Sequence, residues 1–256
     1  MIKITSKRPS RWILIALFLV MVISAVFFLQ IYPLLPEITD LSFYYQLTDP
    51  YEEDGTLLLY STDYIAGFDT LSPYIIPALL AIEDQRFYEH RGVDLIRILG
   101  AAVANLQSGF GVEGGSTITQ QLVKITYLDQ SEKTIRRKVV EAITAMRIER
   151  RYSKEEILET YLNKVYFGHA GYGLQNATTF YFQKDPEDLT LEESAIITGI
   201  IQNPTMHSPL NRPESMLARA ILVINRMEEN GSITELEAAS ARENLKNESF
   251  IIKKTD

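Results

Sequence analysis

The stretch IIPALLAIEDQRFYEHRG, residues 75–92, joins an apolar segment to a dense polar cluster. Ile75, Leu79 and Ile82 recur at helical spacing, which predicts an apolar helix that ends where the charged residues begin. A polar cluster at the end of such a helix is well placed to face a cleft. The stretch therefore predicts a helical fold with a polar site at a helix end.

Glu83 is the first carboxylate of this cluster and follows the apolar Ile82 directly. A carboxylate acts best as a general base when partial burial brings its pKa close to the working pH. The apolar neighbour makes Glu83 a better candidate than Asp84. The alternative is that the acidic residues form surface ion pairs with Arg86 and Arg91.

A second stretch, GGSTITQQLVK over residues 114–124, places two glycines before a helix whose first turns carry hydroxyls and amides. Free N–H groups at a helix N-terminus favour anions. Gln120, Gln121 and Lys124 lie within about one turn of each other, so they offer donors for a sugar or a pyrophosphate. The spacing is equally compatible with an ordinary capped helix.

Residues 133–154 form a basic segment in an otherwise acidic chain. They include eight basic residues and two acidic ones, Glu141 and Glu149. Such a segment would stabilise a pyrophosphate leaving group or contact an anionic bilayer surface. Glu141 follows Lys138 by three positions and Arg137 by four, so positive charge favours its ionised form; a routine helical ion pair is the alternative.

Helical periodicity continues after Pro73 with almost no strand-like alternation. Three helix starts carry a hydroxyl residue followed three positions later by Glu, the order of a capping box. They are Ser153 with Glu156, Thr190 with Glu193, and Thr234 with Glu237. Apolar spacing within 134–152 predicts one buried helical face, formed by Ile135, Val139, Ala142, Ile143 and Met146.

Another helical stretch, ILETYLNKVYFG over residues 157–168, ends in a glycine that marks the end of a helix. Tyr161 and Asn163 are candidates to line a saccharide groove, and core packing is the alternative. The chain has three histidines, too few to predict a histidine metal site.

Trp12 to Leu29 is an unbroken run of eighteen residues in which Ser24 alone is polar. At about 1.5 Å per residue, the run and its flanks reach roughly 30 Å, the thickness of a bilayer's hydrocarbon core. Basic residues precede the run and the first acidic residue is Glu37, so we expect a cytoplasmic N-terminus over 1–11. This predicts a transmembrane anchor over 12–32, with a cleaved signal peptide as the alternative.

The remainder of the chain is acidic. Without the four basic residues before the apolar run, it holds 21 basic and 33 acidic residues, a balance of −12, which argues against general nucleic-acid binding. The absence of cysteine excludes disulfides and thiolate metal sites. We expect residues 33–72 to form a linker and membrane-proximal segment, and 73–250 to form one domain.

Together these stretches resemble glycosyltransferase family 51, the peptidoglycan glycosyltransferases. The family's first motif, E-D-x-x-F-x-x-H-x-G, is complete from Glu83 to Gly92, and the second is GGSTITQQLVK. RKVVE over 137–141 and YSKEEILETYLNKVYFG over 152–168 are similar to the third and fourth, and a looser fifth lies around Arg212. The resemblance covers roughly 73–228 and implies a mostly α, lysozyme-like helical domain with a smaller membrane-proximal lobe, preceded by one N-terminal transmembrane helix.

The resemblance also implies polymerisation of peptidoglycan glycan strands. Glu83 would deprotonate the 4-hydroxyl of the acceptor's N-acetylglucosamine, which attacks the donor's N-acetylmuramic acid and releases undecaprenyl pyrophosphate with inversion. Glu141 would assist near the donor pyrophosphate, and basic residues would offset charge on the leaving group. The implied substrate-binding set is Asp84, Phe87, His90, Ser116, Thr117, Gln120, Gln121, Lys124, Arg137, Lys138, Tyr161 and Asn163.

The same resemblance sets expectations for ligands and location. No cofactor is expected to be obligatory, and a divalent cation, magnesium or manganese, at Glu141 is the alternative. The expected partners are lipid II, the lipid-linked glycan chain, the bilayer and other wall-synthesis proteins, without nucleic acid. We expect a single-pass protein of the cytoplasmic membrane with a periplasmic catalytic domain that moenomycin inhibits.

Two positions depart from the family pattern: Ile125 stands where Asn is common, and Gly100 where Arg is common. No transpeptidase motifs follow the polymerase motifs before Asp256, which favours a monofunctional enzyme. A lytic enzyme of lysozyme-like fold and a non-catalytic scaffold of the wall-synthesis machinery are the alternative functions.

The stretch from Val93 to Leu106 is apolar with few charges. We expect it to border or dip into the outer leaflet of the membrane, where a polyprenyl tail arrives. Burial in the protein core is the alternative.

Overall fold

The computed structural model describes residues 11–38, 66–108, 115–128 and 134–247. Within these ranges the chain forms helices and one isolated bridge between Tyr166 and Tyr172, so the mostly α prediction is confirmed. The α-helices are α1 (Arg11–Ile31), α2 (Ile75–Glu83), α3 (Leu95–Ser108), α4 (Ile118–Tyr127), α5 (Ile135–Ile148), α6 (Lys154–Lys164), α7 (Leu174–Phe182), α8 (Leu191–Ile201), α9 (Pro213–Glu229) and α10 (Glu235–Asn247). Short 3₁₀ helices are η1 (Tyr32–Leu34), η3 (Phe68–Thr70), η4 (Gly168–Ala170) and η5 (Pro186–Asp188).

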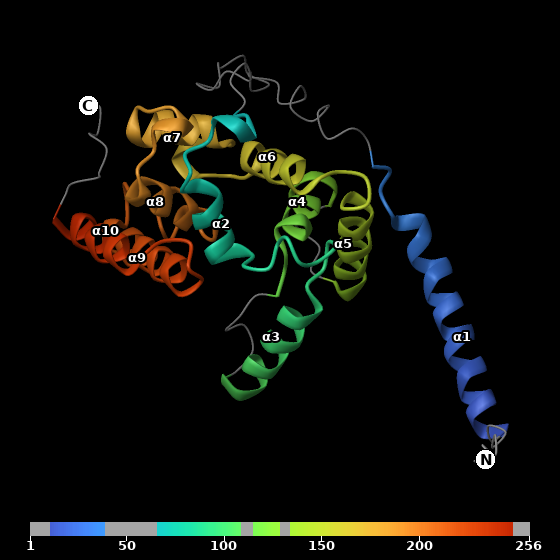
Figure 1. Cartoon of the computed structure of the whole chain (residues 1–256). Helices are drawn as coiled ribbons and strands as arrows, with labels where there is room; N and C mark the ends of the chain where they lie inside the picture. Colours follow the sequence, from blue (N-terminus) through green and yellow to red (C-terminus); the bar gives the residue numbers. More distant parts are fainter. Residues whose placement is uncertain (1–10, 39–65, 109–114, 129–133, 248–256) are drawn as a thin grey trace, which may run out of the picture.

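Helix α8 lies among α2, α7, α9 and α10 in the left part of Figure 1, and every residue from Leu191 to Ile201 is buried. A helix that is apolar around most of its circumference needs neighbours on all sides. Helices α2 and α9 pack directly on α8, and α10 packs on α9. On the other side of the body, α4 packs between α5 and α6. The end of α2 and the start of α4 thus face each other between two packed groups of helices.

Capping boxes fix several helix starts. The reciprocal bonds predicted for Ser153 with Glu156 and for Thr190 with Glu193 are present. Thr234 and Glu237 also exchange backbone-to-side-chain bonds, at 2.8 and 3.3 Å. The structure adds a fourth box, in which Thr117 caps α4 and Gln120 returns to the Thr117 backbone. Such caps set where each helix begins, and therefore which residues of its first turn face the interior.

The predicted buried face of α5 is wrong. Ile135 is 87% exposed and Met146 is 36% exposed. The buried residues are Val140, Glu141, Thr144, Ala145 and Ile148. Polar Glu141 and Thr144 belong to the inward side, which packs on α4, while Val139, Ala142 and Ile143 of the predicted stripe are half-buried beside it.

Helix α1 covers the predicted anchor, and Figure 1 shows it extending away from the helical body. A search of the described residues finds no helix with both the length and the apolar character needed to cross a membrane, so the anchor stays a prediction. The chain after α1 is held against α5. Arg147 Nη1 donates to the Pro36 carbonyl and Arg151 Nη1 to the Ile38 carbonyl, each at 2.9 Å.

Most of the predicted linker, 39–65, lies outside the described residues. Its last part packs on α6. The Asn163 side chain accepts from Ala66 N at 3.1 Å and donates to Ala66 O at 3.0 Å, while Glu159 accepts from Phe68 N at 3.0 Å. These bonds fix the chain that leads into α2.

Candidate active site

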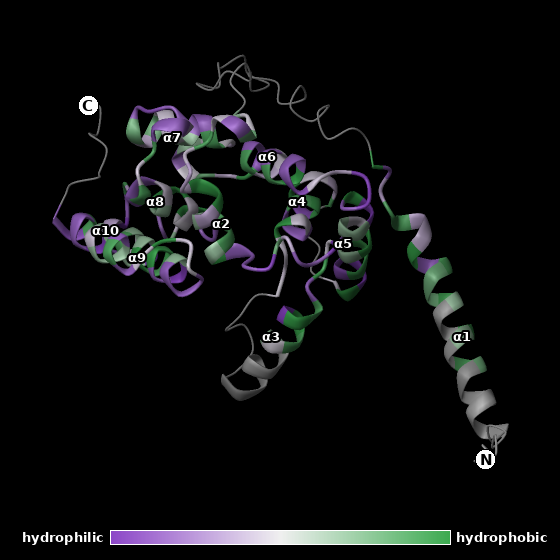
Figure 2. Cartoon of the chain, in the orientation of Figure 1, coloured by the Kyte–Doolittle hydropathy of each residue, from purple (hydrophilic) through white to green (hydrophobic). Residues whose placement is uncertain are grey.

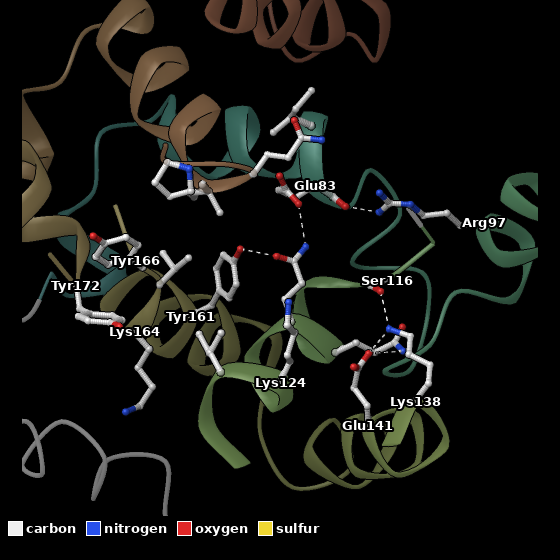
Figure 3. A pocket seen from close by; sticks show the side chains of 18 of the residues that line it. Glu83, Arg97, Ser116, Lys124, Lys138, Glu141, Tyr161, Lys164, Tyr166 and Tyr172 are labelled. Carbon is white, nitrogen blue, oxygen red and sulfur yellow. Dashed lines mark hydrogen bonds and ion pairs between the residues drawn. The ribbon is translucent and has the colours of Figure 1, made fainter. Parts of the chain in front are cut away.

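A pocket of about 700 Å³ opens where the end of α2, α4, α5 and the end of α6 meet α8 and α9. Many of the predicted site residues converge on it. Those that line it are Glu83, Ser116, Gln120, Gln121, Lys124, Arg137, Lys138, Glu141 and Tyr161. Glu83 and Glu141 approach the pocket from different helices, with α4 between them (Figure 3). Stretches far apart in the sequence thus form one site.

Glu83 is the last residue of α2 and is 9% exposed. Its Oε2 accepts a hydrogen bond from Gln121 Nε2 at 2.8 Å. Gln121 Oε1 in turn accepts from the Tyr161 hydroxyl at 2.8 Å, so the amide is fixed at both ends (Figure 3). Among the described residues, Arg219 forms the ion pair with this carboxylate, with Nη2 3.9 Å from Glu83 Oε1. A neutral amide therefore holds this carboxylate, and a cation stands just outside hydrogen-bond range.

Tyr161 is fully buried beneath this carboxylate. Burial, and after it the negative charge of Glu83, raise the pKa of Tyr161 well above its ordinary value. The hydroxyl therefore stays protonated at any physiological pH and remains a donor to Gln121. Tyr161 is both a core residue and a pocket residue, so the two interpretations of it hold together.

Glu141 is 1% exposed on the inner side of α5. Its Oε1 accepts from Gln120 Nε2 at 3.1 Å and forms an ion pair with Lys138 Nζ. Lys138 Nζ also donates to Ser116 Oγ at 2.6 Å. The Lys138–Glu141 ion pair lies within one helix, as the alternative of a routine helical ion pair expected. Its bonds to Ser116 and Gln120 also join α5 to the start of α4.

A divalent cation at Glu141 stays a prediction. The Lys138 ammonium and the Gln120 amide already bind Oε1, and both repel a metal ion placed there. Within the described ranges, no group of three or more His, Cys, Asp or Glu side chains is arranged to hold a metal.

Several predicted residues lie outside the described pocket lining and connect its walls. Asp84 Oδ2 accepts from Ile118 N, at the start of α4, and contacts His90 Nε2, both at 3.0 Å. Thr117 Oγ1 donates to the Gly92 carbonyl at 2.7 Å. These contacts join the chain after α2 to the first turn of α4, which places Glu83 and Gln121 relative to each other.

Phe87 and Asn163 also lie away from the described lining. Phe87 is completely buried, with Lys154 Nζ 4.1 Å from its ring centroid. Both side-chain polar atoms of Asn163 bind the Ala66 backbone. The structure thus gives these two residues supporting positions.

The structure adds pocket residues that the sequence did not single out. They are Arg97, Lys164, Tyr166, Tyr172, Gln202 and Arg219. Burial lowers the pKa of Lys164 to about 8. Tyr166 and Tyr172, whose ring centroids are 5.0 Å apart, form an exposed aromatic pair at one end of the pocket. The loose fifth motif around Arg212 could have directed attention to Arg219, because it leads into α9 and Arg219 lies on that helix.

Arg219 crosses the surface of α8 at a glycine. A Cβ at position 199 would lie 3.1 Å from Arg219 Cγ, so a side chain there would displace the arginine. Burial lowers the pKa of Arg219, and the nearby Glu83 charge opposes that change. Gly199 therefore makes room for a cation directed toward Glu83.

Both departures from the family pattern have a defined place. Ile125 lines the pocket one residue after Lys124, so an apolar group replaces a polar one there. At Gly100 on α3, an added Cβ would meet no atom within 4 Å. That position has room for a long side chain.

Comparison with known proteins agrees with this site. The family model described as transglycosylase matches residues 57–228. Penicillin-binding protein 1A of Escherichia coli (strain K12) is 44% identical over 167 residues, which are 65% of this chain and 20% of that protein. Penicillin-binding protein 1A of Neisseria lactamica is 38% identical over 236 residues, 90% of this chain and 29% of that protein. Penicillin-binding protein 1A of Streptococcus oralis is 43% identical over 162 residues, 62% of this chain and 25% of that protein.

The chain spans between a fifth and a third of the length of these relatives. The expectation of a monofunctional enzyme stays a prediction. The family match covers most of the described helical body and all four motifs that form the pocket. The chain belongs to the glycosyltransferase family 51 transglycosylases.

Proposed function

We propose that the chain polymerises peptidoglycan, transferring a lipid-linked glycan to the 4-hydroxyl of the N-acetylglucosamine of lipid II. The observation that carries the proposal is the presence of two buried carboxylates with different partners in one pocket. Glu83 accepts from the neutral Gln121 amide, which the Tyr161 phenol holds in turn, whereas Glu141 is paired with a lysine. A transfer that needs a base at one end and charge compensation at the other matches this arrangement.

In this reaction Glu83 removes the proton from the acceptor 4-hydroxyl as that oxygen attacks the donor's anomeric carbon. The carbon–oxygen bond to undecaprenyl pyrophosphate breaks, and the linkage inverts to β-1,4. The Gln121 amide leaves Glu83 Oε1 available for the proton because it binds Oε2. Lys124, Arg137 and Lys138 line the same pocket and offset the charge that develops on the departing pyrophosphate.

Helix α3 supports the membrane part of the proposal. Leu95, Ile96 and Leu99 are 69%, 68% and 67% exposed, so core burial does not explain them. The start of α3 is coloured hydrophobic in Figure 2 and projects from the helical body. We place this surface against the bilayer that supplies the lipid-linked substrate.

A liposome flotation assay tests the membrane contact. The Ile96→Asp/Leu99→Asp variant of the domain without residues 1–32 should float less than the unsubstituted domain, since charge opposes insertion of an apolar face. Leu236→Asp, at an exposed leucine of α10, is the control. Equal flotation of all three proteins would contradict the contact.

Polymerisation of purified lipid II by the detergent-solubilised full chain tests the function itself. Wild type should form long strands that moenomycin suppresses, while Glu83→Gln should lose at least about a thousandfold of the rate because the amide accepts no proton. Glu89→Gln, at an exposed glutamate nearby, should retain activity. No product from folded wild type would contradict the proposal, and cleavage of preformed glycan would support a lytic enzyme instead.

A further inference from the structure

Arg97 of α3 contacts the backbone of the residue that carries the proposed base. Helix α2 ends at Glu83, and the last carbonyls of a helix lack partners within it. Arg97 Nη1 donates to the Glu83 carbonyl (Figure 3). A cation at this end also complements the negative end of the helix dipole. Arg97 therefore caps α2 at the residue whose position matters most to the reaction.

Arg97 is itself fixed by a buried carboxylate. Its backbone N–H donates to Asp94 Oδ1 at 2.9 Å, and Arg86 Nε donates to Asp94 Oδ2 at 3.0 Å. Burial alone would raise the pKa of Asp94, but these hydrogen bonds and the Arg86 charge lower it. Arg97 Nη1 also lies 3.9 Å from Asp84 Oδ1, so its charge offsets a second buried carboxylate. The start of α3 and the end of α2 are thus one connected polar unit.

The residues on either side of Arg97 in the sequence are exposed and apolar. Ile96 is 68% exposed and Ile98 is 40% exposed, while the Arg97 side chain is 30% exposed and lines the pocket. Helix α3 therefore combines an outward apolar surface with one inward cation at the proposed base. A shift of α3 would move the group that caps Glu83.

Position 100 lies one helical turn after Arg97, on the same face of α3. Arginine is common at this position in the family that the chain resembles, whereas this chain has glycine with open space around it. Side chains of a helix point toward its N-terminus, so an arginine at 100 would reach back toward the Arg97 guanidinium. The arginine common in the family at position 100 and the arginine present here at position 97 are therefore one helical turn apart.

We propose that Arg97 is a positioning residue that ties the exposed helix α3 to Glu83, in place of an arginine at position 100. It acts through the Glu83 backbone and not on the substrate. The inference rests on the proposed function for its kinetic consequence. Its structural consequence, a fixed end of α2, does not depend on which reaction the pocket performs.

Steady-state polymerisation by the full chain tests the kinetic part. Arg97→Met should lower kcat about 30-fold and leave KM within about twofold, because the base is misplaced while binding groups remain. Arg97→Lys should lose only about threefold, since it keeps the cation. Arg97→Met/Gly100→Arg should recover most of the loss. Arg91→Met, at an exposed arginine, is the matched control.

Hydrogen exchange of the backbone amide of Asp84, which donates to the Leu80 carbonyl at 3.0 Å, tests the structural part without a substrate. Exchange should quicken in Arg97→Met and return toward wild type in the double variant. Unchanged exchange together with unchanged kcat in Arg97→Met would overturn the proposal. A kcat of Arg97→Met/Gly100→Arg no higher than that of Arg97→Met would show that Arg97 does not stand in place of an arginine at position 100. If the three proteins exchange in this order but wild type forms no glycan strands, the proposed function is refuted and the structural role of Arg97 is kept.

Discussion

The two carboxylates of the pocket differ in how completely their charge is balanced. Glu141 is bound directly by a lysine and an amide, and that lysine also binds Ser116. Glu83 has an amide on one oxygen, and its cation, Arg219, stands 3.9 Å from the other. Burial is similar, 1% exposed against 9%, so exposure does not separate them. The difference lies in the partners.

This difference assigns chemical roles. Glu141 is in direct contact with the Lys138 ammonium and holds it in place. A carboxylate with one oxygen toward the pocket is suited to accept a proton from a substrate hydroxyl. In the proposed function, one glutamate of the pocket is therefore the base and the other anchors a cation.

Among changes to the partners of the two carboxylates, removal of the Lys138 cation should have the largest effect. Lys138→Met should lower the polymerisation rate about a hundredfold, because a charge that stabilises the leaving group is lost. It should also lower the free energy of unfolding by about 1–2 kcal/mol, less than a fully buried pair would give, since the Lys138 side chain is 49% exposed. Denaturant unfolding and strand formation measure the two effects.

The double variant Lys138→Met/Glu141→Gln separates these effects. It should regain most of the lost stability, since no unpaired carboxylate remains buried, and none of the activity. Arg136→Met, at an exposed arginine of the same helix, is the control. If Lys138→Met kept the stability and the polymerisation rate of wild type, the proposed difference between Glu83 and Glu141 would be contradicted.

Arg219→Met should have an intermediate effect on the Glu83 side. The separation of 3.9 Å predicts a modest loss, about tenfold in kcat with KM nearly unchanged, because the cation orients the base without binding substrate. Arg226→Met, on the exposed side of α9, should behave as wild type. A rise in KM alone would show that Arg219 binds substrate and does not orient Glu83.

Tyr161→Phe should have the smallest effect. It removes one hydrogen bond to Gln121, worth about 1 kcal/mol, and should lower kcat about fivefold. Because the pKa of Tyr161 is raised on folding, its contribution to stability is complete below about pH 10 and is lost as pH rises further. Unfolding free energies of both proteins between about pH 8 and 11 measure this. If the difference in unfolding free energy between wild type and Tyr161→Phe changed with pH near neutrality, this prediction would be contradicted.

The sequence predicted the helical fold, the capped helix starts and the main residues of the pocket, because those depend on local spacing and on motifs of fixed length. It failed on the buried face of α5, where Glu141 and Thr144 occupy the inward side and Ile135 faces solvent. Apolar periodicity locates a core, and this side of α5 faces a polar site. A helix that lines a pocket breaks the rule on which the prediction rests.

Residue spacing along the sequence also could not predict the contacts between distant segments. Arg97 and Arg219 meet Glu83 from α3 and α9, and neither belongs to a local pattern with that carboxylate. Asn163 looked like a groove residue because it follows Tyr161 closely, yet its amide binds the Ala66 backbone. Side-chain direction and tertiary packing decide such cases.

The contacts of Arg147 in α5 and of Arg151 just after it with the Pro36 and Ile38 carbonyls have a mechanical consequence. Tension applied along α1 would reach α5 through these bonds. Helix α5 carries Glu141 and Lys138, whereas Glu83 lies on α2, which packs on α8 and α9. A pull on the N-terminal helix would therefore load the cation-bearing wall of the pocket before the wall that carries the base.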